Sequence, residues 1–110
     1  IYGIDSRPEA MFDEGVTSMI ADQGSPVELL DVVRSTGGDW NVVIDDGSHV
    51  TEHQILSARV LLPHLAVGGV YIIEDVQEPG RVARAIGGEW VHKGDKTADD
   101  NLVMVRRWRA

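Results

Sequence analysis

Two adjacent aspartates follow an apolar run near the middle of the chain. The stretch VVIDDGSHV, residues 42–50, passes from hydrophobic residues to Asp45 and Asp46 and then to a Gly-Ser-His turn. Two carboxylates side by side at the end of a strand repel each other unless a cation or a proton offsets their charge. The stretch therefore indicates a ligand-binding or catalytic site.

Acids recur where the other strand-like runs end, at Asp5, at Asp22 and at the pair Glu74-Asp75. For any one of them, the simpler interpretation is a carboxylate that caps a loop. For the whole set this interpretation weakens, because parallel strands bring their carboxyl ends to one edge of a sheet, and like charges crowded there repel.

The spacing of these acids predicts a metal site. Asp46 and Glu74 are 28 residues apart, which suits one strand–helix–strand crossover. If the two strands are neighbours, Asp46, Glu74 and Asp75 can converge on one point. Three oxygen donors without a thiolate suit a hard cation, Mg²⁺ or Ca²⁺.

His49 lies three residues beyond Asp46, in the loop above the same edge. Histidine exchanges protons near neutral pH and is the commonest general base. A solvated surface histidine is an equally good interpretation of a residue in a loop, so both remain open. The other three histidines, His53, His64 and His92, are expected to have structural roles.

Strand-like and helix-like segments alternate along the whole chain. The pattern predicts strands over 1–5, 16–21, 40–44, 70–73, 89–93 and 102–107, and helices over 9–14, 26–36, 51–62 and 80–86. Such alternation is typical of one Rossmann-like α/β domain over residues 1–110. Its sheet is expected to be mainly parallel, with helices on both faces and an antiparallel C-terminal hairpin.

Local signals set the ends of two helices. Ser25 is the expected N-cap of the helix that starts with Pro26 and stops at Gly37. Its apolar face is expected to comprise Val27, Leu30 and Val33, with Leu29 as an optional fourth member. Thr51 and Gln54 match a capping box at the next helix, which Pro63 should interrupt near Leu62. The run 40–44 suits a strand buried on both faces.

Composition restricts the function classes. The 110 residues carry a net charge of −8, which disfavours nucleic acid as a partner, and contain no cysteine, which excludes disulfides and thiolate sites. No apolar run reaches the roughly 20 residues of a membrane helix, and no secretory signal is present. We expect a cytoplasmic protein without a membrane partner. The C-terminal cluster of Arg106, Arg107 and Arg109 is interpreted as solvated charge.

The segment VVIDDGSHVTEHQILSARVLLPHLAVGGVYIIEDV resembles the core of class I S-adenosylmethionine-dependent methyltransferases. It is most similar to the metal-dependent sugar O-methyltransferases that modify macrolide antibiotics. Those enzymes carry an Asp-Asp-Gly-Ser-His loop, a Gln-containing helix, a Gly-Gly turn and an Ile-Glu-Asp strand end in this order. The stretches YGID and IADQGSPVELL resemble the family's ribose-binding strand end and its Asp-Gln loop near the adenine.

The resemblance implies an enzyme with S-adenosyl-L-methionine and Mg²⁺ as cofactors. The acceptor would be a small hydroxylated molecule, sugar or polyketide-like, and self-association is left open. The implied roles are metal binding by Asp46, Glu74 and Asp75, proton removal by His49, and cofactor binding by Asp5 at the ribose, Asp22 with Gln23 at the adenine and Asp45 at the methionine part.

One family element should precede residue 1: the first strand with its glycine-rich loop, which lies between the strands at 1–5 and 40–44. A chain without it is expected to have a gap in its sheet, or to fill the gap by exchange between chains. It would then bind cofactor poorly, so a non-catalytic assembly module is the alternative function. A phospho-acceptor receiver domain is set aside, because residues 76–80 lack the lysine it needs.

Overall fold

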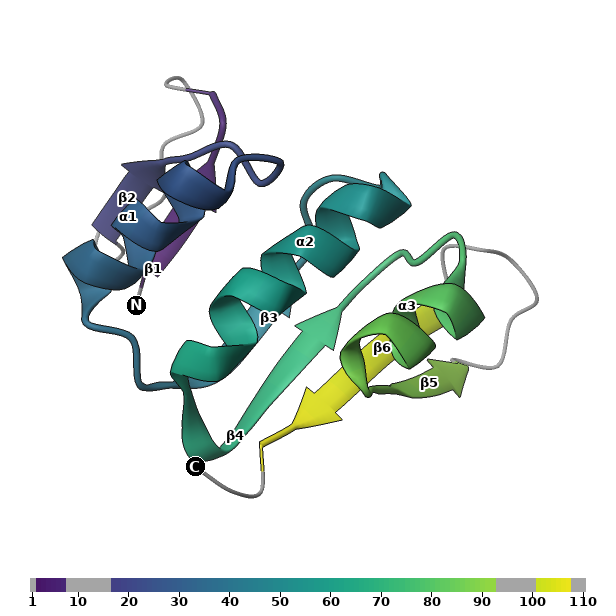
Figure 1. Ribbon diagram of the computed structural model, residues 1–110. Helices are drawn as coiled ribbons and strands as arrows, with labels where there is room; N and C mark the ends of the chain where they lie inside the picture. Colours follow the sequence, from purple (N-terminus) through teal and green to yellow (C-terminus); the bar gives the residue numbers. More distant parts are fainter. Residues whose placement is uncertain (1, 8–16, 93–100, 108–110) are drawn as a thin grey trace.

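The computed structural model describes residues 2–7, 17–92 and 101–107. Its strands form two sheets (Figure 1). Strands β1 (Tyr2–Asp5) and β2 (Thr17–Ile20) make one, and the other has the order β3 (Trp40–Asp45), β4 (Leu65–Ile73), β6 (Asn101–Arg106) and β5 (Glu89–His92). The helix expected over 9–14, most of the loop expected between the last two strands, and Arg109 lie outside the described residues.

The pairing confirms a mixed α/β fold. β1 pairs with β2, and β3 with β4, in parallel, whereas β6 runs antiparallel to both β4 and β5. The predicted C-terminal hairpin is therefore correct. Because β1 and β3 belong to separate sheets, the described strands also show the expected gap between them.

Three helices lie side by side over the strands in Figure 1: α1 (Pro26–Thr36), α2 (Thr51–Leu61) and α3 (Pro79–Ile86). Among the described helices, none combines the length and the apolar character that crossing a membrane requires. The strand order and the short helices give a small layered domain in which α2 and α3 cover one face of the four-stranded sheet.

The ends of α1 follow the sequence prediction, but its buried face does so only in part. Ser25 caps the helix by accepting a 3.3 Å hydrogen bond from the Glu28 amide, and Gly37 ends it in the left-handed conformation that glycine adopts without strain. The predicted apolar face was correct for Leu29, which is buried, and for Val33, which packs against the core, but wrong for Val27 and Leu30, which are exposed. The helix also buries Val32, which was not predicted. The prediction failed because apolar residues occur on both sides of this helix.

α2 begins without the predicted capping box. Its N-cap is Val50, which provides no side-chain hydrogen bond, and both Thr51 and Gln54 are buried instead of capping the helix. Burial against the sheet thus prevailed over local capping. The interruption at Pro63 is confirmed, because a 3₁₀ turn over Leu62–His64 follows α2 directly.

Apolar side chains from the three helices meet β4 and β6 in one core. Ala58 of α2, Val82 of α3 and Val103 of β6 are fully buried at its centre. The remaining buried members are Leu29, Ile55, Leu61, Leu65, Tyr71, Ile73 and Val76. The core therefore lies entirely on the helix side of the four-stranded sheet.

The opposite face of β3 is bare in the described residues, where Val42 is 55% and Ile44 is 60% exposed. The prediction that 40–44 is buried on both faces is therefore wrong for this strand. The physical reason is its position, because β3 lies at an edge of the four-stranded sheet and no described helix covers its second face.

Arg107 follows β6, which is an interior strand of the sheet. The prediction that its charge is solvated is wrong, because its side chain binds the protein. Its Nη1 donates a 2.8 Å hydrogen bond to the carbonyl oxygen of Pro63 and a further one to that of Leu65. Its backbone amide donates to the carbonyl oxygen of Gly69 at 3.0 Å. Arg107 thus joins the end of β6 to the start of β4.

The contrast between the two sheet faces predicts unequal costs for the same substitution. Ile73→Ala removes a fully buried side chain and should lower the free energy of unfolding by about 2–5 kcal/mol. Ile44→Ala, on the bare face, is the matched control and should cost less than about 1 kcal/mol. Urea unfolding followed by circular dichroism measures both, and equal costs would show that the face carrying Ile44 is covered.

Candidate functional site

The carboxyl ends of β3 and β4 form the rim at which the sequence predicts a site. The two strands are in parallel register up to Asp45 and Ile73. The Glu74 amide then donates a 2.9 Å hydrogen bond to the Asp45 carbonyl oxygen, so the ladder continues one step further. Asp46 and Glu74 therefore follow neighbouring strands at the same level, as their spacing predicts.

Asp45 is the buried carboxylate of this rim, with 9% of its surface exposed. Nε2 of Gln23 donates to its Oδ2 at 2.5 Å, and the Gly47 amide donates to its Oδ1 at 3.1 Å. Burial raises the pKa of Asp45 to about 6, even though both hydrogen bonds lower it, and the neighbouring charge of Asp46 adds to the rise. Desolvation therefore dominates the charge state of this carboxyl group.

The three carboxylates predicted to bind metal are more accessible. Asp46 is exposed and Glu74 and Asp75 are half-buried, and none of these side chains forms a hydrogen bond or ion pair with another described residue. The backbone of Asp75 is left-handed, with φ of 54°, a conformation that aspartate adopts more readily than most residues. Within the described ranges, the rim thus presents three carboxylates without a protein partner.

The donor set fits a hard divalent cation by its chemistry, because it consists of carboxylate oxygens alone. The strand register brings Asp46 beside Glu74, and Asp75 follows directly. The expected convergence of all three is not seen: over the described ranges, no three or more His, Cys, Asp or Glu side chains are grouped so as to hold a metal ion. Carboxylates without a cation between them repel one another, which disfavours a close group.

His49 lies in the same loop, three residues past Asp46. Its side chain is exposed and forms no hydrogen bond or ion pair with another described residue. The imidazole is therefore accessible to a molecule that approaches the rim. Its predicted role as a base remains a prediction.

The predicted cofactor residues Asp5 and Asp22 lie at the ends of the other two strands. Oδ1 of Asp5 accepts hydrogen bonds from the backbone amide and the Nε of Arg7, at 2.9 and 3.3 Å, and these contacts lower the pKa of Asp5. Oδ1 of Asp22 accepts a 2.8 Å hydrogen bond from the Gly24 amide. Each carboxylate thus shapes its own loop and keeps its second oxygen for another donor.

Sequence reasoning gave His53 a structural role and did not foresee its partner. Nδ1 of His53 lies 3.0 Å from Oγ of Ser48, which itself accepts a 3.1 Å hydrogen bond from the Val50 amide. The Ser48 hydroxyl is therefore placed to donate to Nδ1, which favours the tautomer that is protonated at Nε2. The five-residue separation gave no recognisable signal for this pair.

Two buried polar groups beneath α2 were also missed. Oε1 of Gln54 and the hydroxyl of Tyr71 are buried without a hydrogen-bond partner among the described residues, and burial raises the pKa of Tyr71. Gln54 falls on the same helix face as Ala58, four residues later, which is the signal that could have placed it in the interior.

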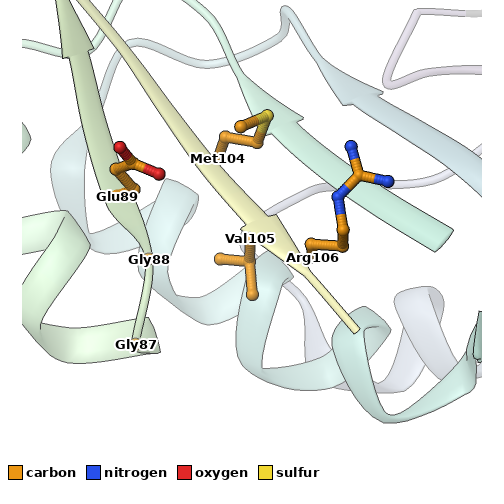
Figure 2. Close-up of a pocket in the computed structure, with 6 residues that line it drawn as sticks. All are labelled: Gly87, Gly88, Glu89, Met104, Val105 and Arg106. Carbon is orange, nitrogen blue, oxygen red and sulfur yellow. The ribbon is translucent and has the colours of Figure 1, made fainter. Parts of the chain in front are cut away.

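A hollow of about 320 Å³ lies elsewhere, on the hairpin of β5 and β6. Figure 2 shows Glu89, Met104 and Arg106 on the side of the strands opposite to Val105. Arg106 pairs with Val70, three residues before the end of β4, so the hollow is displaced from the rim toward the start of that strand. It contains none of the predicted site residues.

The fold matches that of a methyltransferase. The chain superposes with a TM-score of 0.64 and 35% identity on the MycE methyltransferase of the mycinamycin biosynthetic pathway, solved in complex with Mg and SAH. The match covers 71% of this chain and 20% of that one. The same enzyme was also solved with mycinamycin VI bound.

Curated relatives point to the same group. Demethylmacrocin O-methyltransferase from Streptomyces fradiae is 39% identical over 77 residues, which cover 69% of this chain and 19% of the relative. Mycinamicin VI 2''-O-methyltransferase from Micromonospora griseorubida is 38% identical over 76 residues, again 69% and 19%. No protein-family model matches the sequence. The chain, which spans about a fifth of these relatives' length, is thus a homologue of a segment of sugar O-methyltransferases, and the resemblance inferred from its motifs is confirmed.

The raised pKa of Asp45 predicts a pH-dependent stability. The folded state holds its proton up to about pH 6, whereas the unfolded chain releases it near pH 4. Stability from this group is therefore complete below about pH 4 and is lost as pH rises to about 6, by up to about 3 kcal/mol. Urea unfolding in the presence of a chelator should show this loss.

The loss should be absent from Asp45→Asn, and it should persist in the control Asp39→Asn, which changes an exposed carboxylate outside the network. An identical pH dependence in wild type and Asp45→Asn would contradict the assignment of the buried proton to this residue.

Proposed function

We propose that this chain is part of an S-adenosylmethionine-dependent O-methyltransferase, assisted by Mg²⁺, that methylates a hydroxyl group of a sugar or a related natural product. The observation that carries the proposal is the rim itself. Asp46 and the Glu74-Asp75 pair follow neighbouring parallel strands beside the accessible His49, in a chain homologous to sugar O-methyltransferases. The mycinamycin VI complex of MycE supports a small-molecule acceptor.

Cofactor recognition is assigned to the strand ends and loops on the β1–β2 side. Asp5 would accept hydrogen bonds from ribose hydroxyls through the oxygen that Arg7 leaves available. Asp22 would accept one from the adenine amino group, with Gln23 beside it. Asp45 would face the methionine part, where a carboxylate favours the ligand's ammonium group.

Asp46, Glu74 and Asp75 would hold the cation. When bound, Mg²⁺ supplies Lewis-acid chemistry that lowers the pKa of a coordinated acceptor hydroxyl and orients it. The three side chains have no competing protein partner among the described residues, so none has to break an ion pair in order to bind. Binding would also offset the repulsion among them.

His49 would remove the proton of the acceptor hydroxyl. The hydroxyl oxygen bonds to the methyl carbon, the carbon–sulfur bond breaks, and the proton passes to the imidazole. Because the transfer needs the oxygen, carbon and sulfur in line, the positions of the surrounding loops contribute much of the rate enhancement. An exposed, unpaired imidazole can meet a large acceptor without displacing a protein contact.

The alternative is a methyltransferase-like module used for assembly and not for catalysis. It is favoured by one observation, that the three rim carboxylates do not form a metal-binding group within the described part of the chain. Calorimetric titration of Mg²⁺, alone and with S-adenosylhomocysteine, into the gene product that carries this sequence separates the two. Binding of both supports the enzyme, and binding of neither supports the module.

Asp46→Asn should abolish Mg²⁺-dependent methyl transfer in the gene product that carries this sequence. The amide keeps the size of the side chain but removes the charge that binds the cation, so S-adenosylhomocysteine affinity should largely survive. Asp31→Asn, on the exposed side of α1, is the control and should keep its activity. Full activity in Asp46→Asn, or insensitivity of the parent to chelator, would refute the metal assignment.

His49→Ala should slow turnover by about 10²–10⁴-fold, the usual contribution of a general base. The dissociation constant of S-adenosylhomocysteine should change much less, because the imidazole acts on the acceptor and not on the cofactor. Single-turnover rates and calorimetry provide the two values. A larger change in cofactor affinity than in turnover would assign His49 a structural role.

A further inference from the structure

Gln23 makes two hydrogen bonds that join separate loops. Its Nε2 donates to Oδ2 of Asp45 at 2.5 Å, and its Oε1 accepts from the Ser48 backbone amide at 2.9 Å. Gln23 belongs to the loop between β2 and α1, whereas Asp45 and Ser48 flank the turn between β3 and α2. One side-chain amide thus connects the predicted adenine loop with the loop that carries Asp46 and His49.

Gly47 lies against the oxygen of this amide. A Cβ atom at Gly47 would come within 2.6 Å of Oε1 of Gln23, so no residue with a side chain fits there without moving the amide. The Asp45 carboxylate that receives Nε2 is itself buried. The hydrogen bond between Gln23 and Asp45 therefore does not join two fully exposed side chains.

His53 of α2 supports the same turn and lies close to Gly24 in the β2–α1 loop. Nε2 of His53 lies where a Cβ on Gly24 would meet it at 2.9 Å, and Nδ1 of His53 pairs with Ser48 Oγ at 3.0 Å. Ser48 is thus held through its backbone amide by Gln23 and through its hydroxyl by His53. Both contacts fix the position of the turn at residues 46–49.

Backbone pairing supports the end of β3 from the β4 side. Among the described strands, β4 is the neighbour of β3, and the Glu74 amide extends this ladder by donating to the Asp45 carbonyl oxygen. Gln23 approaches from the β1–β2 side, where β3 has no paired strand.

We propose that Gln23 is a positioning residue whose amide clasps the turn carrying Asp46 and His49 and ties it to the predicted adenine loop. The functional weight of this clasp rests on the proposed function, because Asp46 and His49 are the groups it would position. Any contact of Gln23 with cofactor would be additional, since its amide already serves the protein at both ends.

Substitution can exchange the donor and acceptor roles in the clasp. In the parent, Gln23 donates to a carboxylate and accepts from an amide. Gln23→Glu places two carboxylates face to face. Asp45→Asn leaves one donor facing another in either orientation of the new amide, because both Gln23 Nε2 and the Gly47 amide point at residue 45. The double variant restores every pairing, with the Asn amide donating to Glu and its oxygen accepting from Gly47.

The test measures hydrogen exchange of the Ser48 amide by NMR in this 110-residue chain. Gln23→Ala should speed that exchange about tenfold, as expected for the loss of one hydrogen bond. The control Gln77→Ala changes an exposed glutamine and should leave it unchanged. Gln23→Glu and Asp45→Asn should each disturb the 46–49 amides, and the double variant should return Ser48 to within about threefold of the parent.

Rescue by the double variant decides the proposal even if Gln23→Ala lowers overall stability, because both single changes are polar and of nearly unchanged size. Unaltered Ser48 exchange in Gln23→Ala, or a double variant no better than the singles, would overturn it. These measurements need neither cofactor nor turnover. A failure of the methyltransferase assignment is therefore recognised separately, by calorimetry.

Discussion

The parallel pairing of β3 with β4 is the constraint on which both the core and the rim depend. Its register aligns Val43 with Tyr71 and Asp45 with Ile73, so the faces packed against α2 coincide on the two strands. The same register places Asp46 level with Glu74 at the carboxyl edge. A slip of one residue would turn the core face outward and would separate the rim acids.

Burial of Asp45 links this register to the chemistry of the loop that follows. The buried carboxylate at the end of β3 loses hydration, and two donors, from Gln23 and Gly47, recover only part of that loss. The residual cost appears as the raised pKa. The buried carboxylate of Asp45 provides a fixed hydrogen-bond acceptor for the turn that follows. The next residue, Asp46, is exposed, so its side chain is accessible to a ligand.

The sequence predicted most elements well because their signals are local, although β4 begins at Leu65 and not at residue 70 as predicted. The caps Ser25 and Gly37, the break at Pro63 and the acids after β3 and β4 depend on neighbours within a few residues. The buried face of α1, the interior position of Gln54 and the exposure of Ile44 depend on which elements pack together, which no local pattern encodes. The hydrogen bonds of Gln23 join residues that are 22 and 25 positions apart, so they could be identified only from the structure.

A ligand site on a parallel sheet usually lies on strands held from both sides. Here β3 has one paired neighbour among the described strands, and its second edge faces the β1–β2 sheet without pairing to it. Side-chain hydrogen bonds from Gln23 reach the end of β3 from that direction, where backbone pairing is missing. The Gln23 amide therefore adds a side-chain link between the β2–α1 loop and the rim to the backbone pairing of β3 with β4.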